Sequence, residues 1–507
     1  MSEQTSDPRR QIPWLAVRAT AAKRFGIQRF RPGQRELIEA ALLGRDAIGV
    51  LPTGAGKSLC FQLPSLFLSG AVVVVSPLIA LMHDQVKRLE SANIEAARLD
   101  STVAPADQEV QELEIAAGEH DIILITPERL QNPDHLRPLQ QRDIALFVVD
   151  EAHCITEWGH DFRPAYLELS HAIAALGRPP VMALTATAPP QVVEEIGERL
   201  AMNRPVVVQT GIERDNLCFE VLRTVNREEK EQGLLRLLEH QAGSGIVYVA
   251  TVRRADELHT WLVERGIDAE RYHGRMSKAA RASAQNRFMS GRCRVMVATN
   301  AFGMGVDKPD IRFIAHWHYP GSIESYYQEA GRAGRDGETA RCVLFYRLED
   351  KRIRSFFLGR KAPRPADVMK LLKALTDLTA ANKPASMTAL AAASGLHSRR
   401  VSVLVNVLED LEVIERSGRS LTLIGKLRPE QLDDLFGDFE AQHQAERARL
   451  QAMIHYSESP DCRMQLLREY FGEPRGDKCG RCDNCRNPPD VILDGSERHR
   501  DVIALNA

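Results

Sequence analysis

Residues 146–164 read Leu-Phe-Val-Val-Asp-Glu-Ala-His-Cys-Ile-Thr-Glu-Trp-Gly-His-Asp-Phe-Arg-Pro, and this stretch indicates the fold class. Its apolar start does not alternate with polar residues, which predicts a strand buried on both faces of a parallel sheet. The run ends in Asp150 and Glu151, at the strand end where such sheets bind their ligands. One carboxylate there can hold Mg²⁺, and its neighbour can orient the water that attacks a nucleotide γ-phosphate. The stretch therefore predicts an α/β domain that hydrolyses a nucleotide.

The residues that follow these carboxylates suit contact with unpaired bases. His153 can relay the state of the phosphate outward from the site. A polar loop then holds Trp158, His160, Phe162 and Arg163, and aromatic side chains beside an arginine suit stacking on single-stranded nucleic acid. Packing of the aromatic rings beneath the loop is the alternative. The nearby carboxylate pair favours the nucleic-acid interpretation.

A phosphate-binding loop is predicted upstream of this stretch. The short apolar strand at residues 47–51 leads into Pro-Thr-Gly-Ala-Gly-Lys-Ser at residues 52–58 and then into a helix. Glycines allow backbone N–H groups to surround phosphates, a lysine supplies a cation, and a serine can ligate Mg²⁺. Leu51 stands where the strict eight-residue pattern has glycine, so a chance glycine turn is the alternative. The candidate phosphate-binding residues are Thr53, Gly54, Ala55, Gly56, Lys57 and Ser58.

Further apolar runs predict two parallel sheets. The runs at residues 71–75, 122–125 and 181–184 are separated by helix-length segments, as in an open α/β sheet with crossover helices. A second series of runs has no phosphate-binding loop, so it predicts a second α/β domain that is not a complete ATPase; its strands are expected at residues 245–249, 295–298, 311–316 and 342–346. Hydroxyl groups follow three strands of the first series, and we interpret them as helix N-caps.

Two arginines of the second series can act on nucleotide held by the first domain. Arg332 and Arg335 are three residues apart in a glycine-interrupted segment that is predicted to be helical. They can therefore lie on one face and reach a phosphate across a domain interface, as an arginine finger does. A solvated arginine-rich turn is the alternative.

Composition limits the partners and the compartment. The 66 Lys and Arg residues and the 68 Asp and Glu residues give a net charge of −2, so any nucleic-acid contact depends on local clusters of charge. No apolar run reaches the length of about 18–20 residues that a membrane span needs, and the first residues lack a signal-peptide core. We expect a cytoplasmic protein whose polar residues 491–507 form a flexible tail.

Several motifs together resemble a known helicase family. Thr-Gly-Ala-Gly-Lys-Ser (53–58), Asp-Glu-Ala-His (150–153), Ala-Thr-Ala (186–188) and Gln-Glu-Ala-Gly-Arg-Ala-Gly-Arg (328–335) occur in the order seen in superfamily-two helicases. Phe-Arg-Pro-Gly-Gln (30–34), Trp-Gly-His-Asp-Phe-Arg-Pro (158–164) and Phe-Gly-Met-Gly-Val-Asp-Lys-Pro (302–309) narrow the resemblance to the RecQ family. The resemblance implies two RecA-like domains with ATP between them, and movement along single-stranded DNA in the 3′ to 5′ direction.

The resemblance also implies a role for each matching residue. Gln34, whose amide can both donate to and accept from an adenine edge, would recognise adenine with Arg31. A surface glutamine is the alternative for Gln34 alone. The remaining residues carry over as phosphate and Mg²⁺ ligands (Lys57, Ser58), metal partner and catalytic carboxylate (Asp150, Glu151), phosphate contacts from the second domain (Arg332, Arg335) and a loop that couples DNA binding to hydrolysis (Trp158, Phe162, Arg163). Relatives often carry an aromatic residue at Ile27, so looser base specificity is expected.

A cluster of cysteines predicts a metal site near the C-terminus. The four residues are Cys462, Cys479, Cys482 and Cys485, and the last three form a Cys-x-x-Cys-x-x-Cys run. Four thiolates suit a closed, structural Zn²⁺ site, and an iron–sulfur cluster is the alternative. The spacing matches the zinc-binding subdomain of the RecQ family, which favours zinc.

Residues 362–435 are predicted to form a small winged-helix-like domain. Three helices are expected around residues 368–378, 388–393 and 398–411, followed by a hairpin at 413–424. Arg399 and Arg400 would open the recognition helix, where they can contact DNA phosphates or a major groove. A helical spacer with a chance hairpin is the alternative. In many relatives a winged helix follows the zinc site, whereas here it precedes it, so we expect it to separate strands, to grip duplex DNA or to bind a protein.

The expected architecture is α/β with five parts: a first RecA-like domain with an N-terminal lead-in (1–206), a second (207–358), the winged-helix-like domain (362–435), a helical zinc-binding module (440–490) and a tail (491–507). The leading hypothesis is an ATP-dependent 3′ to 5′ DNA helicase in recombination and repair that uses ATP, Mg²⁺ and Zn²⁺. Its expected partners are single-stranded and partly duplex DNA, with DNA repair proteins as candidates. A DNA translocase with little unwinding, a non-motor DNA-binding scaffold and an RNA helicase are the alternatives.

Overall fold

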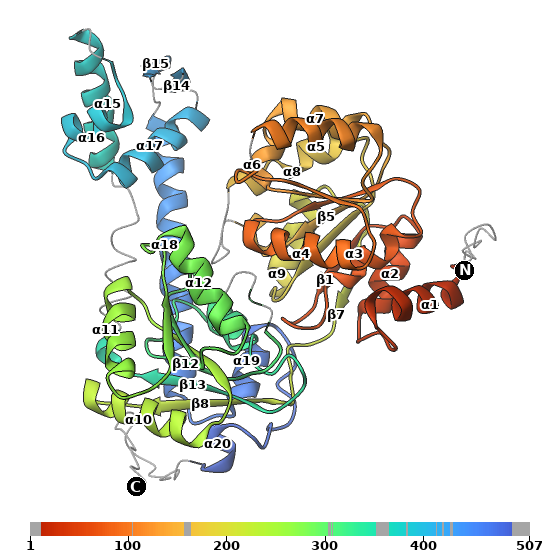
Figure 1. Cartoon of the computed structure of the whole chain (residues 1–507). Coiled ribbons are helices and arrows are strands. Elements are labelled where there is room, and N and C mark those ends of the chain that lie inside the picture. Colours follow the sequence, from red (N-terminus) through yellow and green to blue (C-terminus); the bar gives the residue numbers. More distant parts are fainter. Residues whose placement is uncertain are drawn as a thin grey trace, which may run out of the picture. The chain divides into compact units, whose positions relative to one another are not determined.

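A computed structural model of the chain divides into two compact units, residues 1–347 with 453–507 and residues 348–452 (Figure 1). It describes residues 12–103, 105–156, 164–302, 306, 308–350, 365–381, 384–411, 413–417, 420–425 and 429–488. The loop with Trp158, His160, Phe162 and Arg163 and the expected tail at 491–507 lie outside the described residues.

The first sheet has seven strands, all parallel, in the order β3-β4-β2-β5-β6-β1-β7. Every predicted strand is present. The prediction missed β3 and β7, which are the two edge strands and are only half buried. The strands are β1 (Ala47–Val50), β2 (Ala71–Val75), β3 (Ala96–Leu99), β4 (Ile122–Ile125), β5 (Ile144–Asp150), β6 (Val181–Thr185) and β7 (Val206–Gln209).

Helices cover both faces of this sheet. Alternate strand residues enter two apolar clusters, one with α5, α7, α8 and α9 and the other with α2, α3 and α4, which is why these strands read as unbroken apolar runs. The helical segments are α1 (Trp14–Phe25), α2 (Gln34–Leu42), α3 (Leu59–Ser65), α4 (Ile79–Ser91), α5 (Pro105–Ala117), α6 (Pro127–Leu130), α7 (Pro133–Gln140), η1 (Ala152–Ile155), η2 (Pro164–Tyr166), α8 (Leu169–Ala175) and α9 (Pro190–Arg199).

The second sheet has six parallel strands in the order β10-β11-β9-β12-β13-β8. The four predicted strands are its interior strands, and the two missed strands, β8 and β10, are again the edges. The elements are β8 (Leu217–Arg223), α10 (Arg227–His240), β9 (Ser244–Tyr248), α11 (Val252–Val263), β10 (Ala269–Tyr272), α12 (Lys278–Met289), β11 (Val295–Ala298), β12 (Ile311–His316), α13 (Ile323–Ala330), β13 (Ala340–Tyr346) and η3 (Leu348–Asp350).

The cysteine-rich module packs against the second RecA-like domain. Helix α18 (Pro429–Glu458) leads into α19 (Arg463–Tyr470) and the short α20 (Asp483–Arg486). The ring of Tyr456 at the end of α18 lies 5.3 Å from that of Tyr326. Asp483 accepts hydrogen bonds from the guanidinium of Arg463 and from the backbone N–H of Val221 in β8. The module is therefore joined to the second RecA-like domain by an aromatic contact and by a hydrogen bond to a carboxylate.

The second unit has an apolar core of its own. Its helices are α15 (Pro365–Ala380), α16 (Met387–Ser394) and α17 (Ser398–Asp410), and an antiparallel hairpin joins β14 (Ile414–Ser417) to β15 (Ser420–Leu423). Leu371, Leu390, Leu404 and Leu421 bring all three helices and the hairpin into one cluster. These are the predicted elements in the predicted order. The winged-helix assignment itself stays a prediction.

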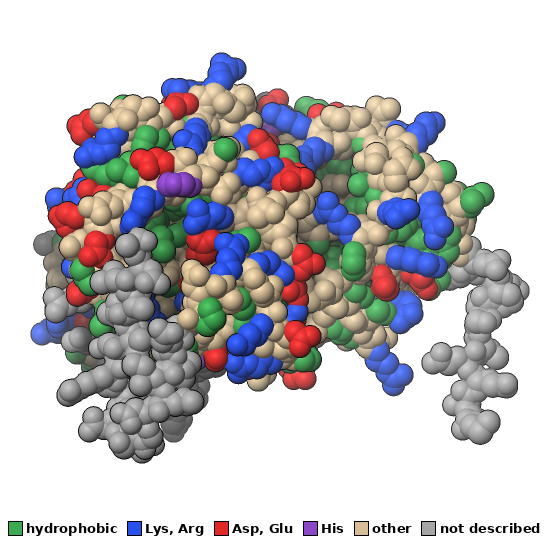
Figure 2. Space-filling model, turned by 90° about the horizontal axis from the view of Figure 1, so that it is seen from below, with side chains coloured by type: hydrophobic (Ala, Val, Ile, Leu, Met, Phe, Trp, Pro, Cys, Tyr) green, Lys and Arg blue, Asp and Glu red, His purple; other side chains and the backbone are tan. Residues whose placement is uncertain are grey.

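The surface carries charges of both signs. Figure 2 shows lysine and arginine side chains interspersed with aspartate and glutamate over the face in view, in agreement with the small net charge. No helix among the described residues combines the length and the apolar composition needed to cross a membrane.

Candidate nucleotide site and metal centre

The phosphate-binding loop follows β1 as predicted. Gly54 and Gly56 have φ angles of +87° and +80°, a conformation that favours glycine. A Cβ atom at Gly56 would lie 2.6 Å from Nε2 of Gln34, so a larger residue there would displace the amide of Gln34 from the loop. Lys57 donates a hydrogen bond from Nζ to the carbonyl of Leu51 at 3.2 Å. Its ammonium group is therefore held across the mouth of the loop.

Arg31 and Gln34 brace this loop. Gln34 is buried, and its Nε2 donates to the carbonyls of Ala55 and Gly56, both at 3.0 Å. Its Oε1 accepts from the backbone N–H of Arg31 at 2.8 Å, and the Arg31 guanidinium donates to the carbonyl of Gly54. Recognition of adenine by these two side chains stays a prediction. In this structure their polar groups hold the phosphate loop.

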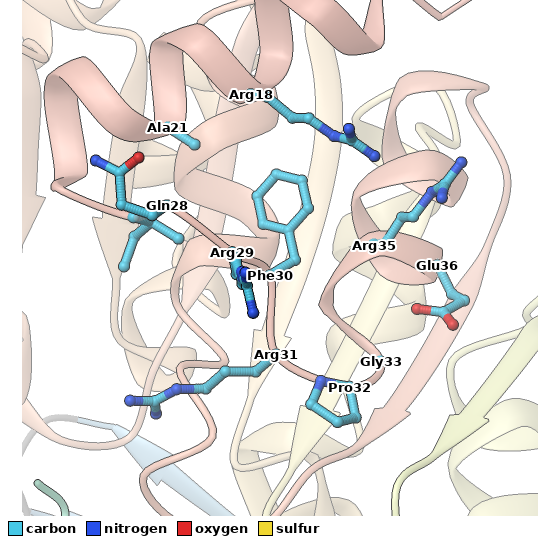
Figure 3. A pocket seen from close by; sticks show the side chains of 11 residues that line it. Arg18, Ala21, Gln28, Arg29, Phe30, Arg31, Pro32, Gly33, Arg35 and Glu36 are labelled. Atoms are coloured by element: carbon cyan, nitrogen blue, oxygen red, sulfur yellow. The ribbon is translucent and has the colours of Figure 1, made fainter.

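A pocket of about 630 Å³ lies beside these residues (Figure 3). The ring of Phe30 stands in it between α1, which carries Arg18, and the start of α2. Its edge contacts Trp14, with ring centroids 6.3 Å apart. The pocket is rich in arginine and is lined by Arg18, Ala21, Ile27, Gln28, Arg29, Phe30, Arg31, Pro32, Gly33, Arg35 and Glu36. It is large enough for a purine base.

Asp150 ends β5 at the ligand edge of the first sheet. It is buried, and its Oδ1 accepts a hydrogen bond from the N–H of Glu151 at 3.0 Å. Burial and the negative charge of Glu151 raise the pKa of Asp150 to about 7, against the opposing influence of Lys57. A buried carboxylate with an acidic neighbour favours a bound cation, because the cation removes the cost of its charge.

Glu151 and His153 connect this edge to the strand beside it. Glu151 has a φ of +49°, a strained conformation for a residue with a side chain. Its Oε2 lies 3.5 Å from Nδ1 of His153 and has no hydrogen-bond partner among the described residues. Nδ1 of His153 lies 2.9 Å from Oγ1 of Thr185, which donates to the carbonyl of Thr187. Thr185, interpreted from the sequence as an N-cap, therefore joins the site.

Tyr166 is a site residue that the sequence did not reveal. It is fully buried, and its hydroxyl donates to the backbone carbonyl of Asp150 at 2.9 Å. It lies just beyond the predicted DNA-coupling loop, and His153 lies just before it. Both flanks of that loop are therefore bonded to the carboxylate edge. The only signal in the sequence was the position of Tyr166, two residues after Pro164.

The two arginines of the second domain have different environments. Helix α13 ends at Ala330, so Arg332 and Arg335 lie in turns and not in the predicted helix. Gly331 directly follows the last helical residue, and Gly334, with a φ of +55°, lies between the two arginines, where it is incompatible with a continuing helix. Arg332 is buried. A Cβ atom at Gly54 would lie 3.4 Å from Cγ of Arg335, so Arg335 reaches the phosphate loop.

The four cysteines form one cluster. The sulfur atoms of Cys462, Cys479, Cys482 and Cys485 all lie within 4.8 Å of one another. Tetrahedral coordination with Zn–S bonds of about 2.3 Å would need sulfurs about 3.8 Å apart, so the cluster fits the ion closely. The hydrogen bond between Cys479 and Cys482 lowers the pKa of the Cys479 thiol and raises that of Cys482, so a bound cation would be needed to hold all four sulfurs as thiolates.

The predicted DNA-binding pair lies at the expected place in the second unit, and its contact with DNA stays a prediction. Arg399 and Arg400 do lie in the first turn of α17, and the side chain of Arg399 lies outside the described residues. Nη1 of Arg400 forms an ion pair with Oδ2 of Asp367 in α15 at 3.0 Å. The charge of Arg400 is thus partly neutralised, because Asp367 is buried beside it.

Three protein-family models match the chain. The model of the DEAD/DEAH box helicases matches residues 31–196, that of the helicase conserved C-terminal domain matches 229–337, and that of RecQ zinc-binding matches 428–486. The matches cover both RecA-like domains and the cysteine cluster.

Two curated proteins of Bacillus subtilis are similar over most of the chain. The ATP-dependent DNA helicase RecQ is 35% identical over 465 residues, which are 91% of this chain and 65% of that protein. The "Probable ATP-dependent DNA helicase RecS" is 40% identical over 354 residues, 69% of this chain and 71% of that protein. The chain thus spans slightly less than two thirds of the length of that RecQ protein.

A solved structure confirms the fold of the two RecA-like domains. Saccharomyces cerevisiae Dbp5 bound to RNA and ADP BeF3 superposes with a TM-score of 0.54 at 18% identity, covering 67% of this chain and 90% of Dbp5. At this identity the likeness concerns the fold alone.

Proposed function

Because the chain belongs to the RecQ family of ATP-dependent DNA helicases, we propose that it hydrolyses ATP to move 3′ to 5′ along single-stranded DNA and to unwind duplex DNA. The direction is the one that the family resemblance implies. Recombination and repair are the processes in which we place this activity, with DNA repair proteins as candidate partners. The cytoplasmic location stays a prediction.

The observation that carries the proposal is the convergence of three groups of residues on one sheet edge. Lys57 belongs to the phosphate loop after β1, Asp150 ends β5 with Glu151 directly after it, and Arg335 approaches Gly54 from the second domain. Phosphoryl transfer needs positioned cations on the phosphates and a carboxylate that orients the attacking water. This set supplies each of those groups.

Each residue then has a role in hydrolysis. Lys57 would bind the β- and γ-phosphates, and Ser58 with Asp150 would hold Mg²⁺, which neutralises developing phosphate charge. Glu151 would orient the attacking water through the oxygen that lies near His153. Arg335, with Arg332 behind it, would stabilise the transition state from the second domain. The base would occupy the pocket beside Phe30 and Ile27.

Coupling to DNA would pass through both flanks of the aromatic loop. His153 on one side is bonded to Thr185, and Tyr166 on the other is bonded to the carbonyl of Asp150. Stacking of bases on Trp158 and Phe162 would therefore act on the carboxylate edge from two directions. This supports a DNA-stimulated ATPase.

The cysteine cluster would hold Zn²⁺ as a structural ion. All four protein ligands are sulfurs, which leaves no open position for chemistry. The second unit would contact duplex DNA or a protein. Its ion pair between Arg400 and Asp367 makes Arg399 the stronger candidate for a phosphate contact.

Two alternative functions, a DNA translocase and a non-motor DNA-binding scaffold, make different predictions for the nucleotide site. A translocase or remodeller would share the whole nucleotide site and differ only in opening little duplex. A non-motor scaffold would not need Lys57, Asp150, Glu151 and Arg335 in one place, so the convergence of these residues disfavours it.

The test is ATP-dependent strand displacement on matched 3′-tailed and 5′-tailed duplexes, with ATP turnover recorded on the same samples. We expect opening of the 3′-tailed substrate alone and turnover that rises with single-stranded DNA. Opening of the 5′-tailed substrate would contradict the direction. Strong turnover without displacement would identify a translocase, and absence of turnover would identify the scaffold.

A further inference from the structure

The linker between the two RecA-like domains is bonded on both of its sides. It comprises residues 210–216, between the end of β7 at Gln209 and the start of β8 at Leu217. One side contacts the turn that carries Arg332 and Arg335, and the other contacts the cysteine-rich module. A connection between two domains that only had to span a distance would not need such contacts.

Arg214 makes the contacts with the arginine turn. Its Nη1 donates to the carbonyl of Gly331 at 2.8 Å, and its Nη2 donates to the carbonyl of Gly334. Asn216 adds a hydrogen bond from Nδ2 to the same Gly334 carbonyl at 2.7 Å. The planar guanidinium thus bridges two carbonyls three residues apart, which fixes the turn more firmly than single bonds would.

This turn faces the phosphate loop of the first domain. A Cβ atom at Gly54 would lie 3.4 Å from Cγ of Arg335 and 3.8 Å from Nη1 of Arg214. A Cβ atom at Gly331 would lie 3.2 Å from Cβ of Thr53. Arg214 therefore lies beside the arginine turn and, like Arg335, close to Gly54 of the phosphate loop.

The cysteine-rich module makes the contacts on the other side of the linker. Glu213 forms ion pairs with Arg468 of α19 and with Arg481. The latter residue directly precedes Cys482, one of the four clustered cysteines. Oε1 of Glu473 accepts a hydrogen bond from the N–H of Ile212 at 2.8 Å. Three side chains of the module therefore bind the two consecutive linker residues Ile212 and Glu213.

A tyrosine ties these contacts to the helix before the turn. The hydroxyl of Tyr327 in α13 donates to the carbonyl of Ile212. Its ring packs edge-on against Phe471 of the cysteine-rich module, with centroids 5.5 Å apart. Module, linker and arginine turn thus form one continuous set of contacts.

We propose that Arg214 is a positioning residue for the arginine turn at residues 331–335, and that the cysteine-rich module supports ATP turnover by holding the linker through Glu213. This inference rests on the proposed function, because it assigns Arg335 to the γ-phosphate. In this proposal the module does more than stabilise the fold, because it also helps to place Arg335 in the nucleotide site.

The experiment compares Arg214→Ala with Arg294→Ala in the full chain. Arg294 is a matched control, because its guanidinium also donates to backbone carbonyls of the second domain, those of Leu238, Gln241 and Gly243, and it contacts neither linker nor arginine turn. For each variant we would measure kcat and KM for ATP with saturating single-stranded DNA, affinity for a fluorescent ATP analogue, zinc content and Tm.

We expect Arg214→Ala to lower kcat by about 10- to 100-fold, with analogue affinity within about threefold of the wild type and zinc content unchanged. Arg294→Ala should match its loss of Tm and keep the wild-type kcat. Arg214→Lys, which can reach only one of the two carbonyls, should fall between Arg214→Ala and the wild type. If Arg214→Ala does not fold, Arg214→Lys against Arg294→Lys makes the same comparison.

A double-mutant cycle tests the contribution of the cysteine-rich module. Glu213→Ala should lower kcat by about three- to tenfold with all zinc retained. In the Arg214→Ala background it should add almost nothing, because both changes act on the same turn. Additive effects would overturn the part of the proposal that concerns the module.

The outcomes separate this inference from the proposed function. A wild-type protein without DNA-stimulated ATP turnover would refute the proposed function, whatever the variants do. A wild-type protein with such turnover and an Arg214→Ala variant with the same kcat would refute the inference alone. Equal losses of kcat in Arg214→Ala and Arg294→Ala would reduce Arg214 to a residue of general stability.

Discussion

The two RecA-like domains share one sheet architecture and differ in what their strand ends present. In the first, the ends of β1 and β5 lead into the phosphate loop and into Asp150. In the second, β12 ends in His316, which is fully buried and stacks on Tyr248 with ring centroids 5.5 Å apart; its Nε2 lies 2.8 Å from Oε2 of Glu329, at hydrogen-bond distance. The first edge presents a glycine-rich loop and a carboxylate pair, whereas the second presents a buried histidine that is bonded to a carboxylate of its own domain.

The difference shows how one fold can be both catalyst and support. Parallel strands bring their carboxyl ends together in either domain. Only residues placed at those ends decide whether the edge binds nucleotide. In the proposed function the second domain contributes through its arginine turn, whose Arg335 lies near Gly54 of the first domain. The predictions below change this division of labour one residue at a time.

The largest effect on ATP turnover is expected from replacing Lys57 of the first domain, with Lys230 of the second domain as the control. Lys57→Ala should lower ATP turnover by about 100-fold or more with or without DNA, since it removes the cation from the phosphate loop. Lys230 of the second domain is buried and donates to the carbonyl of Trp317 at 2.6 Å. Lys230→Ala should lower Tm and leave affinity for an ATP analogue unchanged. Turnover of Lys57→Ala at the wild-type rate would show that the phosphate site is misidentified.

Replacing a residue of the cysteine cluster tests whether a bound metal stabilises the module that packs against the second domain. Cys482→Ser should release the metal and destabilise the module, because metal binding at such sites contributes directly to folding. Metal analysis, the Tm and limited proteolysis would measure this, and the metal found distinguishes zinc from iron. Cys293→Ser is the matched control, because Cys293 is a buried thiol of the second domain outside the cluster. A Cys482→Ser variant with full metal content and an unchanged Tm would refute the assignment.

Replacing an aromatic residue of the loop tests whether the first domain couples DNA binding to ATP turnover. Trp158→Ala should leave binding of an ATP analogue intact and lower DNA stimulation of turnover by about tenfold, the effect of losing one stacked base. Turnover titrated with single-stranded DNA measures it. Trp261→Ala in the second domain is a control, since Trp261 packs under Arg265 at 4.3 Å away from the nucleotide site. Unchanged stimulation in Trp158→Ala would refute the coupling role of the loop.

The smallest effect is expected from replacing Asp150, and it concerns the free energy of unfolding. The pKa of Asp150 is raised from 3.8 to about 7, so the folded state loses stability as pH rises between these values. Asp150→Asn removes this cost. Its gain in unfolding free energy over the wild type should be larger at pH 8 than at pH 5 by about 3 kcal/mol, at about 1.4 kcal/mol per pKa unit, measured without nucleotide or Mg²⁺.

Asp46 provides a control of opposite sign for that experiment. Burial opposes its ionisation, but hydrogen bonds from Arg178 and from the N–H groups of Asn203 and Val181 hold the pKa of Asp46 below 3.8. Asp46 therefore stabilises the fold above that pH and loses its contribution as the pH falls through the lowered pKa. Asp46→Asn should destabilise the protein at both pH 8 and pH 5. A gain for Asp150→Asn that did not change with pH would contradict the raised pKa.

Interior strands and edge strands differed in how well the sequence predicted them. Each interior strand of both sheets was predicted, whereas the four missed strands, β3, β7, β8 and β10, are all edges. Interior strands are covered on both faces and must be apolar throughout. An edge strand has one neighbour and less cover, so β7 alternates between half-buried and exposed residues. Its pattern is too weak to stand out.

By itself the sequence determined which groups form the candidate sites: the glycines and Lys57 of the predicted phosphate loop, the carboxylates at 150 and 151, and the four cysteines of the predicted metal site. Each is specified by neighbours a few positions away, because a loop, a strand end or a Cys-x-x-Cys turn is a local structure. Only the tertiary structure placed Tyr166 under Asp150 and set Glu213 and Arg214 between the cysteine-rich module and the arginine turn. Those contacts join residues as much as 268 positions apart, and no local pattern encodes which distant partners folding will bring together.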